Sequence, residues 1–102
     1  MTAKEEILAA VKSDKTIASH IINYTWMSGS STTVYPIMLW PDDVCLQMDT
    51  TRNMFQKAIG RVMEKYSRLF RYGYFSKNDG SCPAEITFCY TDETAIRLKN
   101  HE

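Results

Sequence analysis

The apolar residues between Thr51 and Tyr66 constrain the fold more than any other feature of the chain. They recur every three or four positions, which is the spacing at which side chains share one face of a helix. The inward face predicted from this spacing consists of Phe55, Ala58, Ile59, Val62, Met63 and Tyr66. The sequence therefore predicts a long helix over 51–66 that buries one side and leaves the other in solvent.

A short helix and a turn are predicted to precede this long helix. Pro41 suits a first helical turn, where its missing N–H is not needed, and the acidic Asp42 and Asp43 are favourable there. The short helix is expected over 41–47. Asp49-Thr50-Thr51 then forms the turn, with a threonine hydroxyl capping the long helix.

Two runs with alternating side chains follow the long helix, over 69–75 and 84–90. An alternation of period two is typical of strands, and Asn78-Asp79-Gly80 between the runs is a typical hairpin turn. We predict a hairpin over 69–90. Asp92 is then predicted to cap a last short helix over 93–100.

The first 40 residues are predicted to form two helices and a strand. Thr2 and Glu5 have the spacing of a capping box, so helices are expected over 2–12 and 15–27. A flexible connection follows, and 32–39 is rich in strand-forming residues. The apolar residues of 1–27 either close the core or form a dimer contact, and the sequence leaves both alternatives open.

The length of 102 residues predicts one domain, with an α+β fold and a two- to three-stranded antiparallel sheet. No apolar run approaches membrane-spanning length, and the chain does not start with a pattern of signal-peptide type. We therefore expect a soluble, cytoplasmic protein.

The charge is distributed unevenly, although the formal net charge is zero. Residues 51–77 carry seven basic side chains and one acidic one, whereas the other residues carry five basic and eleven acidic ones. Positive charge concentrated on one element provides a surface for a polyanion.

The order of short helix, turn, long helix and hairpin over roughly 32–90 resembles the winged helix-turn-helix superfamily of small bacterial, plasmid and phage regulators. The residues that carry the resemblance are Val44, Cys45 and Met48 in the first helix and Thr51, Phe55, Ala58 and Ile59 in the second. With Val34-Tyr35-Pro36-Ile37 before the first helix, the pattern is also similar to the small enterobacterial regulators of the CaiF/GrlA and PapI/FaeA types.

The resemblance implies a transcriptional regulator or accessory protein that binds duplex DNA, with an extra N-terminal helical segment. The long helix would enter the major groove, and the 69–90 hairpin would be the wing. The implied DNA-binding residues are Thr51, Arg52, Asn53, Gln56, Lys57, Arg61 and Lys65 on the helix and Arg71, Lys77 and Asn78 on the wing. No cofactor or metal is implied, and a homodimer through the N-terminal helices would suit a two-half-site operator.

Three other interpretations follow from the residues. The aromatic side chains of 66–90 suggest stacking on single-stranded nucleic acid, but aromatic residues at alternate strand positions usually pack against a helix, so core packing is expected. The acidic remainder of the chain could serve a protein-interaction module, such as an inhibitor of a host factor encoded by a mobile element. Cys45 or Cys89 could respond to oxidation in a sensory regulator.

The sequence provides no sign of an enzyme or a metal site. Cys45, Cys82 and Cys89 match no zinc spacing, and no catalytic triad or phosphate-loop spacing occurs. His20 is expected to pack at the helix surface.

Overall fold

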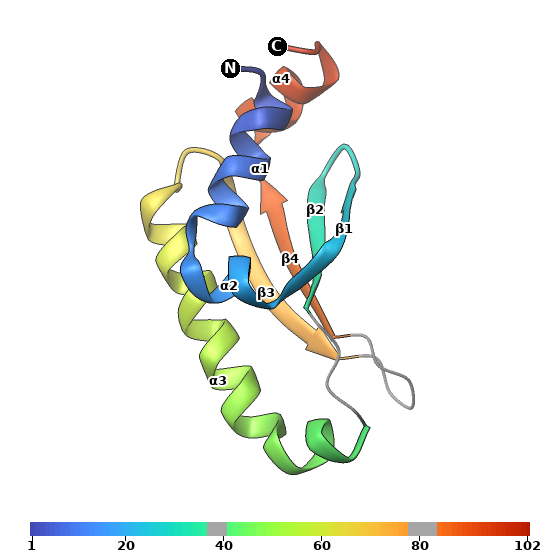
Figure 1. Cartoon of the computed structure of the whole chain (residues 1–102). Helices are drawn as coiled ribbons and strands as arrows, with labels where there is room; N and C mark the ends of the chain where they lie inside the picture. The colour runs from blue at the N-terminus through green and yellow to red at the C-terminus, as the bar shows by residue number, and fades with distance from the viewer. Residues whose placement is uncertain (37–40, 78–83) are drawn as a thin grey trace.

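The computed structural model describes residues 1–36, 41–77 and 84–102. The elements are α1 (Ala3–Ser13), α2 (Lys15–His20), β1 (Ile21–Met27), β2 (Ser31–Pro36), α3 (Pro41–Lys65), β3 (Phe70–Lys77), β4 (Ala84–Tyr90) and α4 (Asp92–Lys99). The strands form one antiparallel sheet in the order β1-β2-β4-β3 (Figure 1). The predicted α+β class is confirmed, and the sheet has four strands rather than two or three.

The first helix was predicted correctly, whereas the second is much shorter than expected. The Thr2 hydroxyl accepts a hydrogen bond from the Glu5 amide at 3.2 Å, as a capping residue should. The predicted helix over 15–27 is wrong beyond His20, because residues 21–27 form β1. This stretch is rich in β-branched and aromatic residues, which fit a pleated sheet, and it pairs with β2.

The segment after β1 is a tight hairpin connection. The Ser28 amide donates to the Ser31 carbonyl at 2.8 Å, and the Ser28 hydroxyl accepts from the amides of Ser30 and Ser31. β2 lies in the interior of the sheet, between β1 and β4. Pro36 is its last residue, so the strand ends where a backbone donor is missing.

The predicted turn at 49–51 is wrong, because α3 is one continuous helix over Pro41–Lys65. The segment 41–67 is therefore not a helix-turn-helix. Asp49 stands where such turns usually carry glycine, and no glycine or proline occurs from 42 to 59. Nothing in the local sequence interrupts the i→i−4 hydrogen bonds, so the helix continues through the expected turn.

The core lies between one face of the sheet and helices α1, α2 and α3. The predicted inward face of α3 is confirmed, since Phe55, Ala58, Ile59 and Val62 are buried. The other buried apolar residues of this core are Ile7, Ala10 and Val11 of α1, Ile17 of α2, Val34 of β2, Leu69 before β3, Phe70 of β3, and Ile86, Phe88 and Tyr90 of β4. Ile7 therefore serves the core rather than a dimer contact through α1.

Helix α3 approaches β3 closely at Gly73. A Cβ atom built at this position would lie 2.8 Å from Cγ2 of Ile59 and 3.1 Å from Cδ1 of Phe88. The absence of a side chain at Gly73 thus lets α3 lie directly on the strand. Phe55 of the helix stacks on Phe75 two residues further along, with ring centroids 5.6 Å apart.

The aromatic residues of the second hairpin divide between the two faces of the sheet. The predicted hairpin is confirmed, although its turn, with Asn78 and Cys82, lies outside the described residues. Core packing is confirmed for Phe70, Phe75, Phe88 and Tyr90, which are buried or packed against the core. It is wrong for Tyr72 and Tyr74, which are exposed because they point away from α3.

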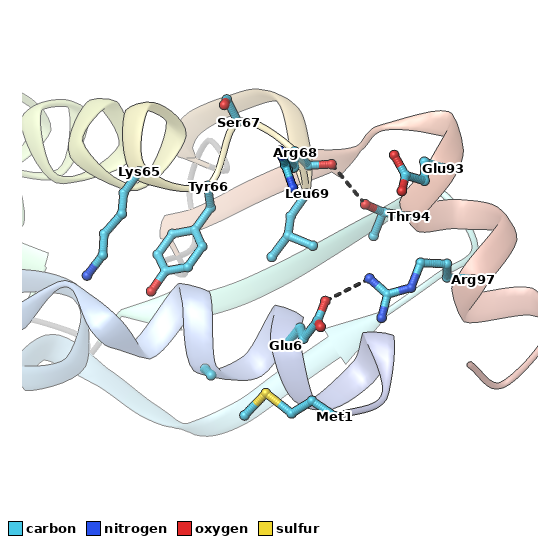
Figure 2. Close-up of a pocket in the computed structure, with 11 residues that line it drawn as sticks. Met1, Glu6, Lys65, Tyr66, Ser67, Arg68, Leu69, Glu93, Thr94 and Arg97 are labelled. Atoms are coloured by element: carbon cyan, nitrogen blue, oxygen red, sulfur yellow. Dashed lines mark hydrogen bonds and ion pairs between the residues drawn. The ribbon is translucent and has the colours of Figure 1, made fainter.

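The predicted C-terminal helix is confirmed as α4, but its cap is Thr91 rather than Asp92. The Thr91 hydroxyl accepts from the Thr94 amide at 3.3 Å, and Asp92 occupies the first turn instead. Arg97 of α4 donates to the Glu6 carboxylate of α1 at 2.7 Å, which ties the two helices together (Figure 2).

Candidate nucleic-acid interface on helix α3

The side of α3 that faces away from the sheet carries most of the predicted DNA-binding residues. Its exposed side chains include Arg52, Asn53, Gln56, Lys57, Arg61 and Lys65. They share one side because the buried residues at 55, 58, 59 and 62 fix the opposite side against β3 and β4. The N-terminal part of α3 extends past the end of the sheet (Figure 1).

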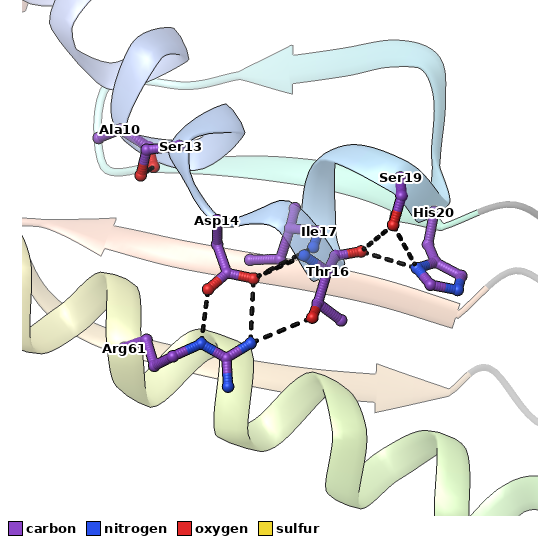
Figure 3. A network of polar contacts seen from close by, with 8 residues as sticks. All are labelled: Ala10, Ser13, Asp14, Thr16, Ile17, Ser19, His20 and Arg61. Carbon is purple, nitrogen blue, oxygen red and sulfur yellow. Dashed lines mark hydrogen bonds and ion pairs between the residues drawn. The ribbon is translucent and has the colours of Figure 1, made fainter.

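Helix α2 borders this exposed side of α3 and is joined to it by an ion pair between Arg61 and Asp14 (Figure 3). Nε of Arg61 lies 2.7 Å from Oδ2 of Asp14, and Nη2 lies 3.1 Å from Oδ1. The same Nη2 donates to the Thr16 hydroxyl at 3.2 Å. This two-pronged geometry fixes the orientation of the guanidinium.

Asp14 holds both helices, because its carboxylate also caps α2. Oδ1 accepts from the backbone amides of Thr16 and Ile17 at 3.0 and 3.3 Å. The hydrogen bond from Arg61 lowers the pKa of the Asp14 carboxyl, and the backbone amides lower it further, against the opposing effect of burial. The Asp14 side chain is 8% exposed and that of Arg61 is 54% exposed.

Arg61 is one of the predicted DNA-binding residues, and the structure places its guanidinium in an ion pair with Asp14. Arg61 is therefore a positioning residue that holds α2 beside α3. Arg52 and Lys57 differ from it, since neither forms an ion pair with any residue whose side chain the structure describes, a set that leaves out 41–51.

A shallow groove of about 400 Å³ runs between α2 and α3. Thr16 lines it from α2, and Asn53, Met54, Lys57 and Arg61 line it from α3. The exposed Lys15 begins α2 next to this groove. Sequence reasoning missed Thr16, because only the packing of α2 on α3 brings it to the predicted helix face.

The other predicted site residues do not join this surface or cannot be placed on it. Arg71 is exposed on β3, where the register of the β3–β4 pairing shifts between Phe70 and Tyr72. The side chains of Thr51 and Lys77 and the whole of Asn78 lie outside what the structure describes. The candidate interface therefore consists of the exposed side of α3 together with Lys15 and Thr16.

A second cavity, of about 640 Å³, lies at the other end of α3 between α1 and α4 (Figure 2). The Glu6–Arg97 ion pair lies in its wall, and the hydrogen bond from Arg97 lowers the pKa of Glu6. Nζ of Lys65 lies 5.4 Å from the centroid of the Tyr66 ring. Acidic and basic side chains alternate here, so the cavity does not favour one sign of ligand charge.

The histidine and cysteine side chains that can be placed do not form a metal centre. Nδ1 of His20 lies 2.7 Å from the Thr16 carbonyl oxygen, and its ring meets Phe55 edge-on at 5.7 Å, which confirms the predicted packing role. Cys89 is a free thiol on β4. Within the described part of the chain, no three His, Cys, Asp or Glu residues gather where they could hold a metal ion.

No protein-family model matches the chain, and no curated protein or solved structure matches it either. None of the helices in the described ranges combines the length and apolar character needed to cross a membrane.

Proposed function

We propose that the chain binds duplex DNA through the exposed side of α3 and acts as a small transcriptional regulator or accessory DNA-binding protein. The observation that carries this proposal is the pair of cations at Arg52 and Lys57. Both side chains are exposed, and neither has an ion-pair partner among the side chains that the structure describes. Lys57 lines the groove, and Arg52 lies on the same helix. DNA phosphates can neutralise such charges and release bound counterions.

The proposed mechanism places the exposed side of α3 in the major groove. An α-helix with its side chains is about 10–12 Å wide, and the major groove of B-DNA is about 12 Å wide. Asn53 and Gln56 can each bond an adenine with two hydrogen bonds, while Arg52 and Lys57 can reach guanine or phosphate. Because α3 is continuous, this mode uses one projecting helix and not a helix-turn-helix.

Helix α2 supports the proposed binding mode from the side. Arg61 holds α2 through Asp14, so Lys15 and Thr16 would face the DNA backbone next to the groove. Contacts of this kind fix the register of a helix on duplex DNA without reading its sequence. Lys65, more than two turns beyond Lys57, would reach a phosphate further along the backbone.

The test is fluorescence-anisotropy titration with a labelled random duplex at two salt concentrations. The double variant Arg52→Ala/Lys57→Ala should bind more weakly and reduce the slope of log K against log salt by about two, since each phosphate contact contributes about 0.9. The control Lys4→Ala/Lys99→Ala removes the same charge from exposed positions on α1 and α4.

An equal loss of DNA affinity in both double variants would mean that net charge alone governs binding, and it would refute the α3 interface. Absence of binding by the unaltered protein at low salt would refute DNA binding altogether. In that case, the protein-interaction module would become the preferred function.

A further inference from the structure

The face of the sheet opposite the helices carries a row of side chains that crosses all four strands. In the registered pairing, Trp26 of β1 lies beside Thr33 of β2, Thr33 beside Thr87 of β4, and Thr87 beside Tyr74 of β3. The next row places Tyr72 beside Cys89. All these positions alternate with the core residues of the same strands, so they point away from α3.

Aromatic rings occupy both ends of this face, and small hydroxyl residues occupy its middle. Trp26, Tyr72 and Tyr74 are 51%, 55% and 39% exposed. Thr33 and Thr87 are each only 5% exposed, and their hydroxyls lie 3.1 Å apart and bond to each other, so the centre is covered by its neighbours and its polar groups are satisfied. The rings at the two ends are therefore the accessible part of this row.

The two tyrosines stand at alternate positions of one strand, about 6.6 Å apart along its axis at 3.3 Å per residue. Their ring centroids are 5.6 Å apart and the ring planes are tilted by 37°. This spacing allows each ring to take its own planar partner. Aromatic residues arranged in this way on an open four-stranded sheet are suited to stacking unpaired bases.

The charge at the Tyr72 end of the face favours an anionic partner. Arg71 directly precedes Tyr72 on β3, and its exposed side chain pairs with no acid among the side chains that the structure describes. Glu85 alternates with the buried Ile86 and pairs with Ser76, so it lies on the same face at the Tyr74 end. An anionic chain would therefore meet positive charge at Tyr72 rather than at Tyr74.

We infer that this open face, defined by Trp26, Tyr72, Tyr74 and the flanking Arg71, binds single-stranded nucleic acid by stacking its bases on the rings. A duplex cannot bind in this way, because its bases are already stacked and paired. The inference goes beyond the proposed duplex-binding function and does not depend on it, since α3 lies on the other side of the sheet. Arg71 would contact a phosphate of the stacked nucleotides.

The test compares a labelled oligothymidine, which does not pair with itself, with a labelled duplex of equal length. Tyr72→Leu/Tyr74→Leu should weaken oligothymidine binding at least tenfold, because stacking on each ring carries a substantial share of the affinity. The matched control Tyr72→Phe/Tyr74→Phe keeps the rings and should stay within about twofold of the unaltered protein. Duplex affinity should not change in either variant.

A second measurement uses the unaltered protein and so does not rely on the folding of a variant. Oligothymidine should quench the emission of Trp26, and the quenching should disappear in Trp26→Phe. Arg52→Ala/Lys57→Ala should retain oligothymidine binding while it binds duplex DNA more weakly, which separates a failure of this inference from a failure of the proposed function.

Two results would overturn the inference. One is equal oligothymidine affinity in the Leu and unaltered proteins together with no quenching of Trp26. The other combines two observations: oligothymidine does not bind, and sedimentation shows that the unaltered protein is a dimer whereas Tyr72→Leu/Tyr74→Leu is a monomer. That result would assign the face to a second copy of the chain.

Discussion

Replacing Gly73 with alanine tests the packing of α3 on β3, which presents the candidate DNA interface. The added Cβ would lie 2.8 Å from Ile59 Cγ2, 3.1 Å from Phe88 Cδ1 and 3.3 Å from Met63 Sδ. Carbon atoms pack best at about 3.5–4.0 Å, so the helix would have to move outward by several tenths of an ångström.

The expected change in the free energy of unfolding follows from two opposing effects. Overpacking a core costs about 1–3 kcal/mol, whereas removing a glycine from a strand interior returns about 0.5–1 kcal/mol of chain entropy. We expect Gly73→Ala to lower the free energy of unfolding by about 1–2 kcal/mol. For a domain of about this size, each kcal/mol corresponds to a shift of about 4–8 °C in the melting temperature.

The same substitution at Gly60 provides a matched control with the opposite sign. A Cβ at this position meets no atom within 4 Å, and the residue lies on the exposed side of α3. Gly60→Ala should therefore raise the free energy of unfolding by about 0.5–1 kcal/mol. Urea denaturation followed by circular dichroism measures both variants. A Gly73→Ala protein as stable as Gly60→Ala would show that α3 does not lie on this strand as described.

Three further predictions test other parts of the fold. If α3 is continuous, Thr50→Pro should reduce helicity and destabilise the protein by about 3 kcal/mol, whereas a native turn at this point would accommodate the proline. Circular dichroism and urea denaturation measure the two effects. Phe88→Ala should destabilise by about 3–5 kcal/mol because its ring is fully buried, and the exposed Ile96→Ala should stay within about 0.5 kcal/mol, as measured by thermal melting. Arg61 lowers the pKa of Asp14 in the folded state. The ionised carboxylate should therefore stabilise the fold fully at pH values above its ordinary pKa of about 3.9. This stabilisation should be lost as the pH falls through the lower pKa of the folded state. Asp14→Asn should accordingly be less stable than the unaltered protein at neutral pH, and this deficit should shrink as the solution is acidified. A deficit that does not change with pH would contradict this assignment.

The elements that the sequence predicted well are those that local periodicity determines. The buried side of α3 follows from residues spaced by three and four, and the exposed side follows as its complement. Ile21 continued the helical spacing of Ile17, so the change to a strand at β1 escaped prediction because only pairing with β2 selects it. The turn at 49–51 was expected from a capping threonine hydroxyl, whereas local propensity also allowed the continuous helix that forms.

The features of the site that depend on distant contacts were not predictable. Asp14 and Arg61 are 47 residues apart in the chain, so no local pattern indicates that this arginine is already paired. In β3, both alternating sets contain aromatic residues, and the pattern does not say which set is buried. The close approach of α3 at Gly73 determines which set is buried, and it leaves Tyr72 and Tyr74 on the exposed face of the sheet.

The strand order β1-β2-β4-β3 has a consequence for how the chain folds. Each hairpin can form locally, but the sheet is completed only when β2 meets β4, which brings Thr33 beside Thr87 across 54 residues of chain. The segment enclosed between them contains α3. Long-range pairing of this kind is expected late on the folding pathway, because the enclosed loop must first be ordered. Separation of β2 from β4 would divide the sheet into its two hairpins, so hydrogen-exchange protection of these two strands should match the global stability of the domain.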